Sequence, residues 1–436
     1  MIWGYDNINM MENDSVKQVY SSIYIEESGI QVVCAEFFNT RFNVIFQDRF
    51  LCEGIIDFKV LDIEKLSYSI KNALDTASKK IGASIKKVIL VLPPFQFKKF
   101  NINVNVVPNA MVIEKSDIAK ALSDSLKFNV SDDLVIVNSF VTKYTINGLT
   151  SHKNPVGEKC HDFYISIDLL CCNKDLAYNY IKAINKAGYD ILDITLNNYS
   201  ISKESLIIEK SMRYNVVLLD IGRTHTYLTL LKNSSIQSSE IIHSGISNFF
   251  QDVYNKYKIE MNSIADLVKY NKFDEDNKDD VIYAWTNNSG VNCNITFDDF
   301  FNTFKNNLDL YVDNIASMCK PIFDNGETLL VVTGEGADMY NLTDMLKKTL
   351  PCQFNIFTPD EIGVRDPSFS AIYGSFQIYK EKADLNSLSV SCVDLYEYNN
   401  SVDIKTSSTN SDGLTITTKI KNIFSQYLLK EDKKHE

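Results

Sequence analysis

Glycine and proline are scarce in this chain, at 16 and 8 of 436 residues, whereas asparagine, lysine and isoleucine are abundant. This composition is typical of an AT-rich coding sequence, so one glycine missing from a loop is weak evidence of a lost function. No uncharged apolar run reaches the roughly 18 residues of a membrane-spanning helix, so we expect no integral membrane protein. The nine cysteines include no C-x-x-C pair, which is typical of reduced thiols in a cytoplasmic protein and argues against a zinc site.

Basic residues are also fewer than acidic residues. The chain has 44 Lys and Arg against 56 Asp and Glu, which gives a formal net charge of −12. The field of the whole molecule repels phosphate backbones, so we expect no nucleic-acid partner, and any anionic partner must meet a local basic patch. Residues 1–18 contain acids where a signal peptide has positive charge, and no apolar segment follows them, so we expect no export.

The hydrophobic content of 45% is that of a globular protein, and the length suggests about three domains at roughly 150 residues each. Near the N-terminus, β-branched and aromatic segments are separated by turn residues, and an amphipathic helical pattern with Asp62 as its N-cap follows. The predicted elements are strands at 22–26, 30–37 and 42–51, a helix at 62–81 and a buried strand at 86–92.

The same order of elements recurs about 190 residues later, which suggests an old duplication. The second set comprises strands at 215–220, 227–232 and 236–243, a helix at 246–257 and a strand at 328–333. A small α/β insert lies between the two sets, with strands predicted at 102–114, 134–147 and 163–169 and helices at 116–126 and 174–187.

These patterns divide the chain into seven parts. We expect a flexible N-terminus at 1–21, a first half at 22–100 and 196–214 with the insert at 101–195, and a second half at 215–250 and 327–385 with a second insert at 251–326. A polar linker at 386–412, in which Val390 to Leu395 could add a short strand, and a tail at 413–436 complete the chain.

Two loops carry a resemblance to a known fold. Asp220 to Thr226 (DIGRTHT) resembles the phosphate loop D-I-G-G-G-T-T, and Thr333 to Ala337 (TGEGA) resembles the T-G-G-G-A turn against which adenosine lies. Both belong to the α/β nucleotide fold shared by actin and the heat-shock chaperone ATPases. The resemblance implies an actin-like fold with two duplicated halves.

Finer matches resemble the bacterial cell-division family FtsA. Residues 188–194 resemble its G-L-E-V-D-D-L segment, residues 363–368 with Ala371 and Gly374 resemble the stretch that closes its nucleotide domain, and residues 147–157 resemble a run of its characteristic insert. The resemblance implies nucleotide-contacting residues at Asp220, Gly222, Thr224, Thr226, Gly245, Asp266, Lys269, Gly334, Gly336 and Ala337.

The phosphate loops also depart from the family pattern. The first loop, 24–29 (YIEESG), lacks the family's Asp and places two glutamates where phosphates would lie. Each of these two carboxylates would repel a nearby phosphate group by about 1 kcal/mol or more. In the other two loops Arg223 and Glu335 replace glycines. We therefore expect ATP with Mg²⁺ to bind weakly or not at all, and the protein to be at most a very weak ATPase without catalytic residues.

The remaining reactive side chains suggest no further chemistry. We interpret His225 as a loop residue rather than a catalyst. The other histidines do not have the spacing of metal ligands, so we predict no metal site. Cys171 and Cys172 follow an apolar strand and are predicted to be core residues.

The tail combines an apolar stripe with basic flanks. Ile416, Ile420, Ile423, Phe424, Tyr427 and Leu428 recur at helical spacing, and Lys419, Lys421 and Lys430 lie outside the stripe. This pattern predicts an amphipathic helix that binds anionic membranes, and it resembles the FtsA membrane-targeting helix. A terminal helix packed on its own domain is the alternative. A linker of about 27 residues would give the tail a reach of roughly 30 Å.

The FtsA resemblance implies an adaptor that tethers FtsZ polymers to the inner face of the cell membrane at the division site. In that family the first insert contacts a neighbour in actin-like filaments, and the second insert receives the FtsZ tail peptide. A PilM-like pilus-assembly scaffold, which shares the fold and the insert, is an alternative. An ATP-dependent enzyme such as a sugar kinase or chaperone ATPase is an alternative of another class, but it would need a working first phosphate loop and a placed carboxylate base.

Overall fold

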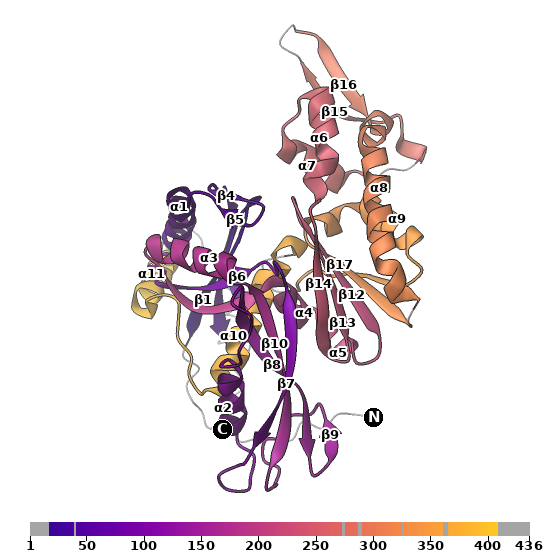
Figure 1. Ribbon diagram of the computed structural model, residues 1–436. Helices are drawn as coiled ribbons and strands as arrows, with labels where there is room; N and C mark the ends of the chain where they lie inside the picture. Colours follow the sequence, from indigo (N-terminus) through magenta and orange to yellow (C-terminus); the bar gives the residue numbers. More distant parts are fainter. Residues whose placement is uncertain are drawn as a thin grey trace, which may run out of the picture.

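The computed structural model describes residues 17–38, 41–272, 275–286, 290–324, 326–360 and 365–408. These residues form two halves, each built on a five-stranded sheet (Figure 1). In spatial order the first sheet comprises β11 (Asp190–Leu196), β6 (Lys87–Leu92), β1 (Gln18–Glu26), β2 (Gly29–Phe38) and β3 (Arg41–Phe50). The second comprises β18 (Gln353–Ile356), β17 (Thr328–Thr333), β12 (Asn215–Ile221), β13 (Thr226–Lys232) and β14 (Ser235–Ile242).

The two sheets repeat one topology. In the first sheet β1, β2 and β3 pair antiparallel, β1 also pairs in parallel with β6, and β6 pairs in parallel with β11. In the second sheet β12, β13 and β14 pair antiparallel, β12 also pairs in parallel with β17, and β17 pairs in parallel with β18. The predicted repetition of elements is therefore confirmed. Because the order is the same, the first hairpin turns of the two halves occupy equivalent positions.

The helix α1 (Ile63–Ile81) covers the first sheet with its apolar stripe and begins where the sequence predicts. The Asp62 carboxylate accepts hydrogen bonds from the amides of Glu64 and Lys65 at 3.0 and 3.1 Å. Gly82 ends the helix in the left-handed conformation at φ 80°. A two-stranded hairpin of β4 (Ile55–Ile56) and β5 (Lys59–Val60) precedes α1, and α3 (Lys174–Lys186) packs beside it.

Two helices, α4 (Asn197–Glu204) and α10 (Ser370–Leu385), cross each other between the two sheets (Figure 1). Their backbones approach so closely that a Cβ atom on Gly374 would lie 1.9 Å from the carbonyl oxygen of Ser200. Glycine at position 374 therefore sets the spacing of this crossing. The short helix α5 (Ile207–Lys210) follows α4, and the 3₁₀ turn η3 (Pro367–Phe369) leads into α10.

The predicted α/β insert forms a four-stranded antiparallel sheet at the lower end of Figure 1. Its order is β7 (Lys98–Val106), β10 (Phe163–Asn173), β8 (Leu134–Ile146) and β9 (Leu149–Ser151), with α2 (Lys115–Ser125) packed on it. The strand predicted at 102–114 differs from β7, which starts earlier and ends before Pro108, a residue without a backbone N–H for a sheet ladder. Cys171 and Cys172 are fully buried, as predicted.

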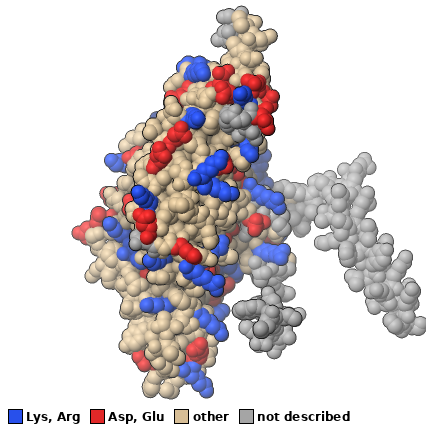
Figure 2. All heavy atoms as spheres, turned by 90° about the vertical axis from the view of Figure 1, so that its right-hand side faces the viewer, with Lys and Arg blue, Asp and Glu red and all other residues tan. Residues whose placement is uncertain are grey.

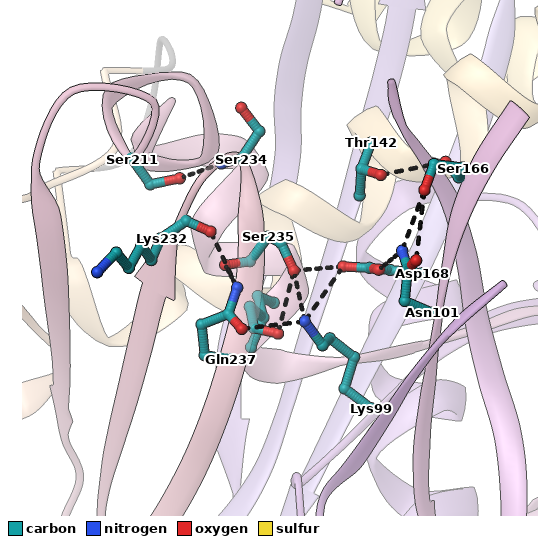
Figure 3. A network of polar contacts seen from close by, with 11 residues as sticks. Lys99, Asn101, Thr142, Ser166, Asp168, Ser211, Lys232, Ser234, Ser235 and Gln237 are labelled. Carbon is teal, nitrogen blue, oxygen red and sulfur yellow. Dashed lines mark hydrogen bonds and ion pairs between the residues drawn. The ribbon is translucent and has the colours of Figure 1, made fainter. Parts of the chain in front are cut away.

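A polar network joins the insert to the second half (Figure 3). The Lys99 ammonium of β7 donates to Ser235 Oγ at 3.0 Å and to Gln237 Oε1 at 3.1 Å. The Asp168 carboxylate is 1% exposed and accepts hydrogen bonds from Ser235 and, at 2.7 Å, from Asn101. Because a buried carboxylate is stable only when it is hydrogen-bonded, this network fixes the insert against β14.

The expected insert at 251–326 is not a separable unit. Its long helix α8 (Phe297–Phe323) packs with β12, β17, α6 (Ile246–Tyr257) and α9 (Tyr340–Thr349) in one hydrophobic core. The remainder is α7 (Met261–Tyr270), the 3₁₀ turn η1 (Glu275–Asn277) and the hairpin of β15 (Val281–Thr286) and β16 (Asn292–Thr296). The hairpin protrudes at the upper end of Figure 1.

The expected linker at 386–412 is wrong over its first part. Cys392 and Val393 are buried, Val393 forms a β-bridge with Ile85, and helix α11 (Leu395–Ser408) follows. The amide of Cys392 donates to the carbonyl of Val19 at 2.8 Å, and its carbonyl accepts from the amide of Lys86 at the same distance. The polar composition is that of a surface helix, and the few apolar residues fill a cleft beside β1.

The predicted amphipathic tail, with all of its candidate membrane-binding residues, lies outside the described residues. No helix in the described part of the chain has both the length and the apolarity to cross a membrane. On the face shown in Figure 2, Lys and Arg side chains alternate with Asp and Glu, and no basic field gathers there.

Candidate functional site

Three loops meet in the cleft between the two halves. The β1–β2 turn comes from the first half, and the β12–β13 loop and the turn after β17 come from the second. Gly334 follows β17 at φ 82°, and a Cβ atom there would lie 2.5 Å from the Asp220 Oδ1 atom. Only glycine therefore lets the turn after β17 approach the end of β12 this closely.

Glu26, at the end of β1, is held by two tyrosines from opposite halves. Its Oε1 atom accepts hydrogen bonds from the hydroxyl of Tyr24 at 2.7 Å and from that of Tyr227 at 2.9 Å. Burial, together with the charge of Glu26, raises the pKa of both phenols well above the usual range, so both remain protonated donors. The residues of the first loop thus form a bridge between the halves.

Asp220 lies beside this bridge in the position predicted for a nucleotide contact. Its Oδ2 atom accepts a hydrogen bond from the side-chain amide of Asn197 at 3.1 Å. Burial, followed by the nearby charges of Glu26 and Glu335, raises the pKa of Asp220 to about 8. At neutral pH this carboxyl group is therefore mostly protonated.

Glu335 forms ion pairs with two arginines, one across the cleft and one in its own half. Arg49 on β3 of the first half contacts its Oε1 atom, and the Nε atom of Arg223 lies 3.0 Å from its Oε2 atom. Arg223 also donates to Asn262 of α7 at 3.3 Å. We call Arg49, Glu335 and Arg223 the Glu335 clamp. It joins β3, the β12–β13 loop and the turn after β17, and each of its side chains is no more than about a third exposed.

Two cavities adjoin the clamp. The smaller measures about 20 Å³, room for about one water molecule, and it is lined by Tyr24, Glu26, Arg49, Asp220, Gly222 and Gly334 among others. The larger measures about 330 Å³, at the lower end of the range for small-molecule sites, and it is lined by Arg223, Asp266, Lys269, Asp338, Met339 and Phe369 among others. The Glu335 side chain lines both.

The structure thus brings together five of the predicted site residues. Asp220, Gly222 and Gly334 line the small cavity, and Asp266 and Lys269 line the larger one, where Lys269 pairs with Asp338 of the 3₁₀ turn η2 (Glu335–Asp338).

The other five predicted residues make packing contacts or caps. Thr226 is buried and hydrogen-bonds the hydroxyl of Tyr311 at 2.5 Å, and Thr224 contacts the ring of His225. An added Cβ atom would collide with the β12–β13 loop at Gly245 and with the Ile221 side chain at the end of β12 at Gly336, and Ala337 is buried. These positions support the loop rather than face the cavities.

The side chains that fill the cleft do not fit ATP with Mg²⁺ in this arrangement. A triphosphate cannot enter a cavity of about 20 Å³ that carboxylates line. A carboxyl group whose pKa is raised to about 8 is also a poor Mg²⁺ ligand at neutral pH. The larger cavity could still hold a ring-sized group.

The cleft architecture prompts comparison with known proteins. Over 372 residues the chain is 21% identical to the cell division protein FtsA of Bacillus subtilis, and the match covers 83% of each chain. It is 18% identical over 377 residues to FtsA of Streptococcus pneumoniae, covering 85% of this chain and 82% of the relative. The chain is thus similar to FtsA over most of its length.

Among solved structures, the FtsA-like chain is similar to the PilM–PilN type IV pilus biogenesis complex, with a TM-score of 0.54 and 11% identity. The match covers 82% of this chain and 98% of the other. It confirms the predicted actin-like fold class. No family model matches the chain.

Sequence reasoning identified Arg223 and Glu335 as departures from the FtsA pattern but missed that they pair. Arg49 had no motif signal, because its role depends on β3 lying opposite the second half. Asp57 and His243 were missed for the same reason, although the structure places both beside His225.

Proposed function

We propose that this protein is a cell-division scaffold that tethers FtsZ polymers to the inner face of the cytoplasmic membrane. The observation that carries the proposal is the likeness to FtsA over 83% of both chains, which spans both halves and the insert. Its relatives are named as cell division proteins, and the polymer and membrane roles are carried over from that family.

We further propose that the cleft is held closed by the Glu335 clamp rather than by nucleotide. The clamp joins β3 of the first half to two loops of the second half, the β12–β13 loop and the turn after β17, that resemble nucleotide contacts in an actin-like fold. The ion pair with Arg49 supplies attraction between the halves without a ligand, and the ion pair with Arg223 fixes the Glu335 carboxylate within the second half. The protein then acts as a binding module, with at most a very weak ATPase activity.

The proposed membrane contact is the tail at 413–436. Helix α11 extends to Ser408, so residues 409–412 separate it from the proposed tail and residues 409–415 separate it from Ile416, the first residue of the apolar stripe, instead of the 27 residues expected from composition. The tail therefore starts from a fixed point beside α1, and the distance between body and membrane is short. Several tails on one polymer would bind together, so avidity would add to the weak affinity of each.

Liposome co-sedimentation tests the membrane contact. The full chain should pellet with vesicles that contain anionic lipid, and a chain that ends at residue 412 should remain in the supernatant. A chain that ends at residue 430 is the matched control, since it loses six residues but keeps the stripe, and it should pellet like the full chain. Changing Ile423 and Phe424 to Asp should mimic the longer truncation. Equal pelleting of all four proteins would contradict the tail as the anchor.

The FtsZ contact is proposed for the second insert. Deleting all of 251–326 would remove the buried face of α8 and unfold the second half, so the test must spare it. Replacing residues 272–294, which contain β15 and the first three residues of β16, by a short Gly-Ser linker should abolish binding of the FtsZ C-terminal peptide. Retained peptide binding with an unchanged melting temperature would place the contact elsewhere.

The PilM likeness favours a second candidate, a pilus-assembly scaffold that shares the fold. The two candidates differ in the tail and in the partner. Liposome binding that depends on the stripe, together with FtsZ binding, supports the division scaffold. Failure of both with a folded body supports the PilM-like role.

A further inference from the structure

Three metal-binding side chains from distant parts of the chain meet at the mouth of the cleft. Asp57 comes from the β4–β5 turn of the first half, His225 from the β12–β13 loop and His243 from the end of β14 in the second half. Asp57 Oδ1 lies 3.5 Å from His225 Nε2 and 3.0 Å from His243 Nδ1. One ligand atom from each residue lies within 4.8 Å of the others.

The neighbours of this cluster hold its ligand atoms in place. Thr224 Oγ1 lies 3.0 Å from His225 Nδ1, so this nitrogen can donate to the hydroxyl and leave Nε2, which faces Asp57, with a free lone pair. The Asp57 amide donates to the Glu27 carboxylate at 2.6 Å, which anchors the turn to the first loop. Glu27, one of the two acids that depart from the FtsA pattern, thus positions Asp57.

The backbone of the turn is strained in a way that serves the cluster. Asp57 and Phe58 have φ values of 46° and 66°, in the left-handed region that side chains other than glycine rarely adopt. This conformation places the Phe58 ring 4.4 Å from the His225 ring and 6.4 Å from the His243 ring, measured between centroids. An apolar ring against two imidazoles and a carboxylate shields one side of the cluster from water.

The two distances from Asp57 Oδ1 match the requirements of a tetrahedral metal centre. Metal–ligand bonds of about 2.0–2.2 Å place neighbouring ligand atoms about 3.3 Å apart, close to both Asp57 separations. Imidazole nitrogens and a carboxylate oxygen suit Zn²⁺ better than Mg²⁺ or Ca²⁺, which prefer oxygen ligands alone. Asp57 and His243 are 54% and 57% exposed, so a metal ion can reach them from solvent.

We propose that Asp57, His225 and His243 form a Zn²⁺ site that ties the first half to the second. Three protein ligands leave one tetrahedral position for water or for a group from a partner. Because the ligands come from both halves, bound metal holds the cleft mouth closed alongside the Glu335 clamp. The site is independent of the FtsZ and membrane roles proposed above.

Metal titration of the tag-free full chain, stripped with chelator and dialysed, tests the proposal. Calorimetry with Zn²⁺ should give one saturable site, and Co²⁺ should give visible absorption bands of a tetrahedral centre. Zn²⁺ should also raise the melting temperature, because it binds only when the two halves are together.

The exposed ligands provide variants that will fold. Asp57→Asn and His243→Gln should each weaken Zn²⁺ binding at least about tenfold and remove the rise in melting temperature. His152→Gln is the matched control, because His152 is an exposed histidine of the insert, remote from the cluster, and it should behave like the parent. His225→Gln should weaken Zn²⁺ binding as the other two variants do. Because His225 is buried, the melting temperature of this variant without metal is measured as well, to show that it folds.

Two outcomes would overturn the site. The first is an absence of saturable Zn²⁺ binding by the parent. The three residues would then be a hydrogen-bonded cluster across the cleft and no metal site. The second is binding by both Asp57→Asn and His243→Gln with the affinity of the parent, which would place the metal elsewhere on the chain.

Discussion

Glu335 and Arg223 each replace a glycine of the FtsA pattern, and each supplies the partner that the other needs. A lone arginine in a phosphate loop would attract anions, and a lone glutamate would repel them. Paired, they neutralise each other and fill the space between the loops, and Arg49 adds a contact from the opposite half. Glu335 and Arg223, which argue against nucleotide binding in the sequence, therefore form a stabilising contact in the fold.

Removing the acid from the clamp should convert it into an anion site. Glu335→Gly leaves Arg49 and Arg223 facing the same space, and guanidinium groups bind phosphate oxygens well. We expect the ATP affinity measured by calorimetry to rise at least about tenfold. The loss of two charge-assisted hydrogen bonds should lower the free energy of unfolding by about 1.5–3 kcal/mol.

Glu335→Gln is the matched control for this change, because it removes the charge but keeps the volume. It should weaken the clamp and raise ATP affinity less than Glu335→Gly does. If neither variant binds ATP better than the parent, the clamp is not what keeps nucleotide out.

Asp220 should make the protein less stable as the pH rises. Its folded pKa of about 8 lies above the unfolded value of 3.8, so between pH 4 and 8 the folded state keeps a proton that the unfolded state has released, and a rise in pH favours unfolding. Asp220→Asn removes this cost and keeps an acceptor for Asn197. The gain in unfolding free energy should be negligible below pH 4 and should grow by about 2 to 4 kcal/mol between pH 5 and pH 8.

Urea denaturation of the parent and the variant at pH 5, 6.5 and 8 measures this difference. The exposed Asp132→Asn serves as control and should follow the parent at each pH. A gain that is constant across the pH range would show that Asp220 is not buried as a neutral acid.

Sequence reasoning predicted most secondary structure elements but not their mutual contacts. Strand and helix periods placed α1, α6, β12 and β17 within a few residues of their bounds, since each pattern is local. The linker prediction failed because it relied on Ser, Thr and Asn content. Cys392 and Val393, two apolar residues of that stretch, contact β1 and the segment before β6, more than 300 residues away in the chain. No local window contains that information.

The segment after α10 should act as a clasp on the first half. A chain that ends at residue 386 loses the buried side chains of Cys392, Val393 and Tyr398 and the hydrogen bonds to Val19 and Lys86. We expect the free energy of unfolding to fall by about 3 kcal/mol or more, since burial of each such side chain contributes about 1.5–3 kcal/mol.

A chain that ends at residue 408 is the comparison, because it keeps the clasp and loses only the tail. Its melting temperature should equal that of the full chain. If the two truncated chains melt at the same temperature, the clasp does not stabilise the body and the linker prediction regains support.

The whole molecule combines a duplicated fold with a cleft that its own side chains close. Sequence alone could predict the duplication, since the same order of elements recurs, and it could find two of the three clamp residues as departures from a pattern. It could not find the Glu26 bridge or the Asp57 cluster, because these depend on the halves facing each other. Closure by internal contacts suits a scaffold, which needs a fixed shape more than a turnover cycle.

The most direct measurement is a co-sedimentation of FtsZ polymers with anionic liposomes, with and without this protein and with and without ATP. We predict that FtsZ pellets with liposomes only when the full chain is present, and that the amount does not depend on ATP. A chain that ends at residue 412 should bind FtsZ but leave it in the supernatant when liposomes alone are spun down. FtsZ recruitment that requires ATP would contradict the closed cleft, and a failure of the full chain to bring FtsZ to the liposomes would contradict the scaffold itself.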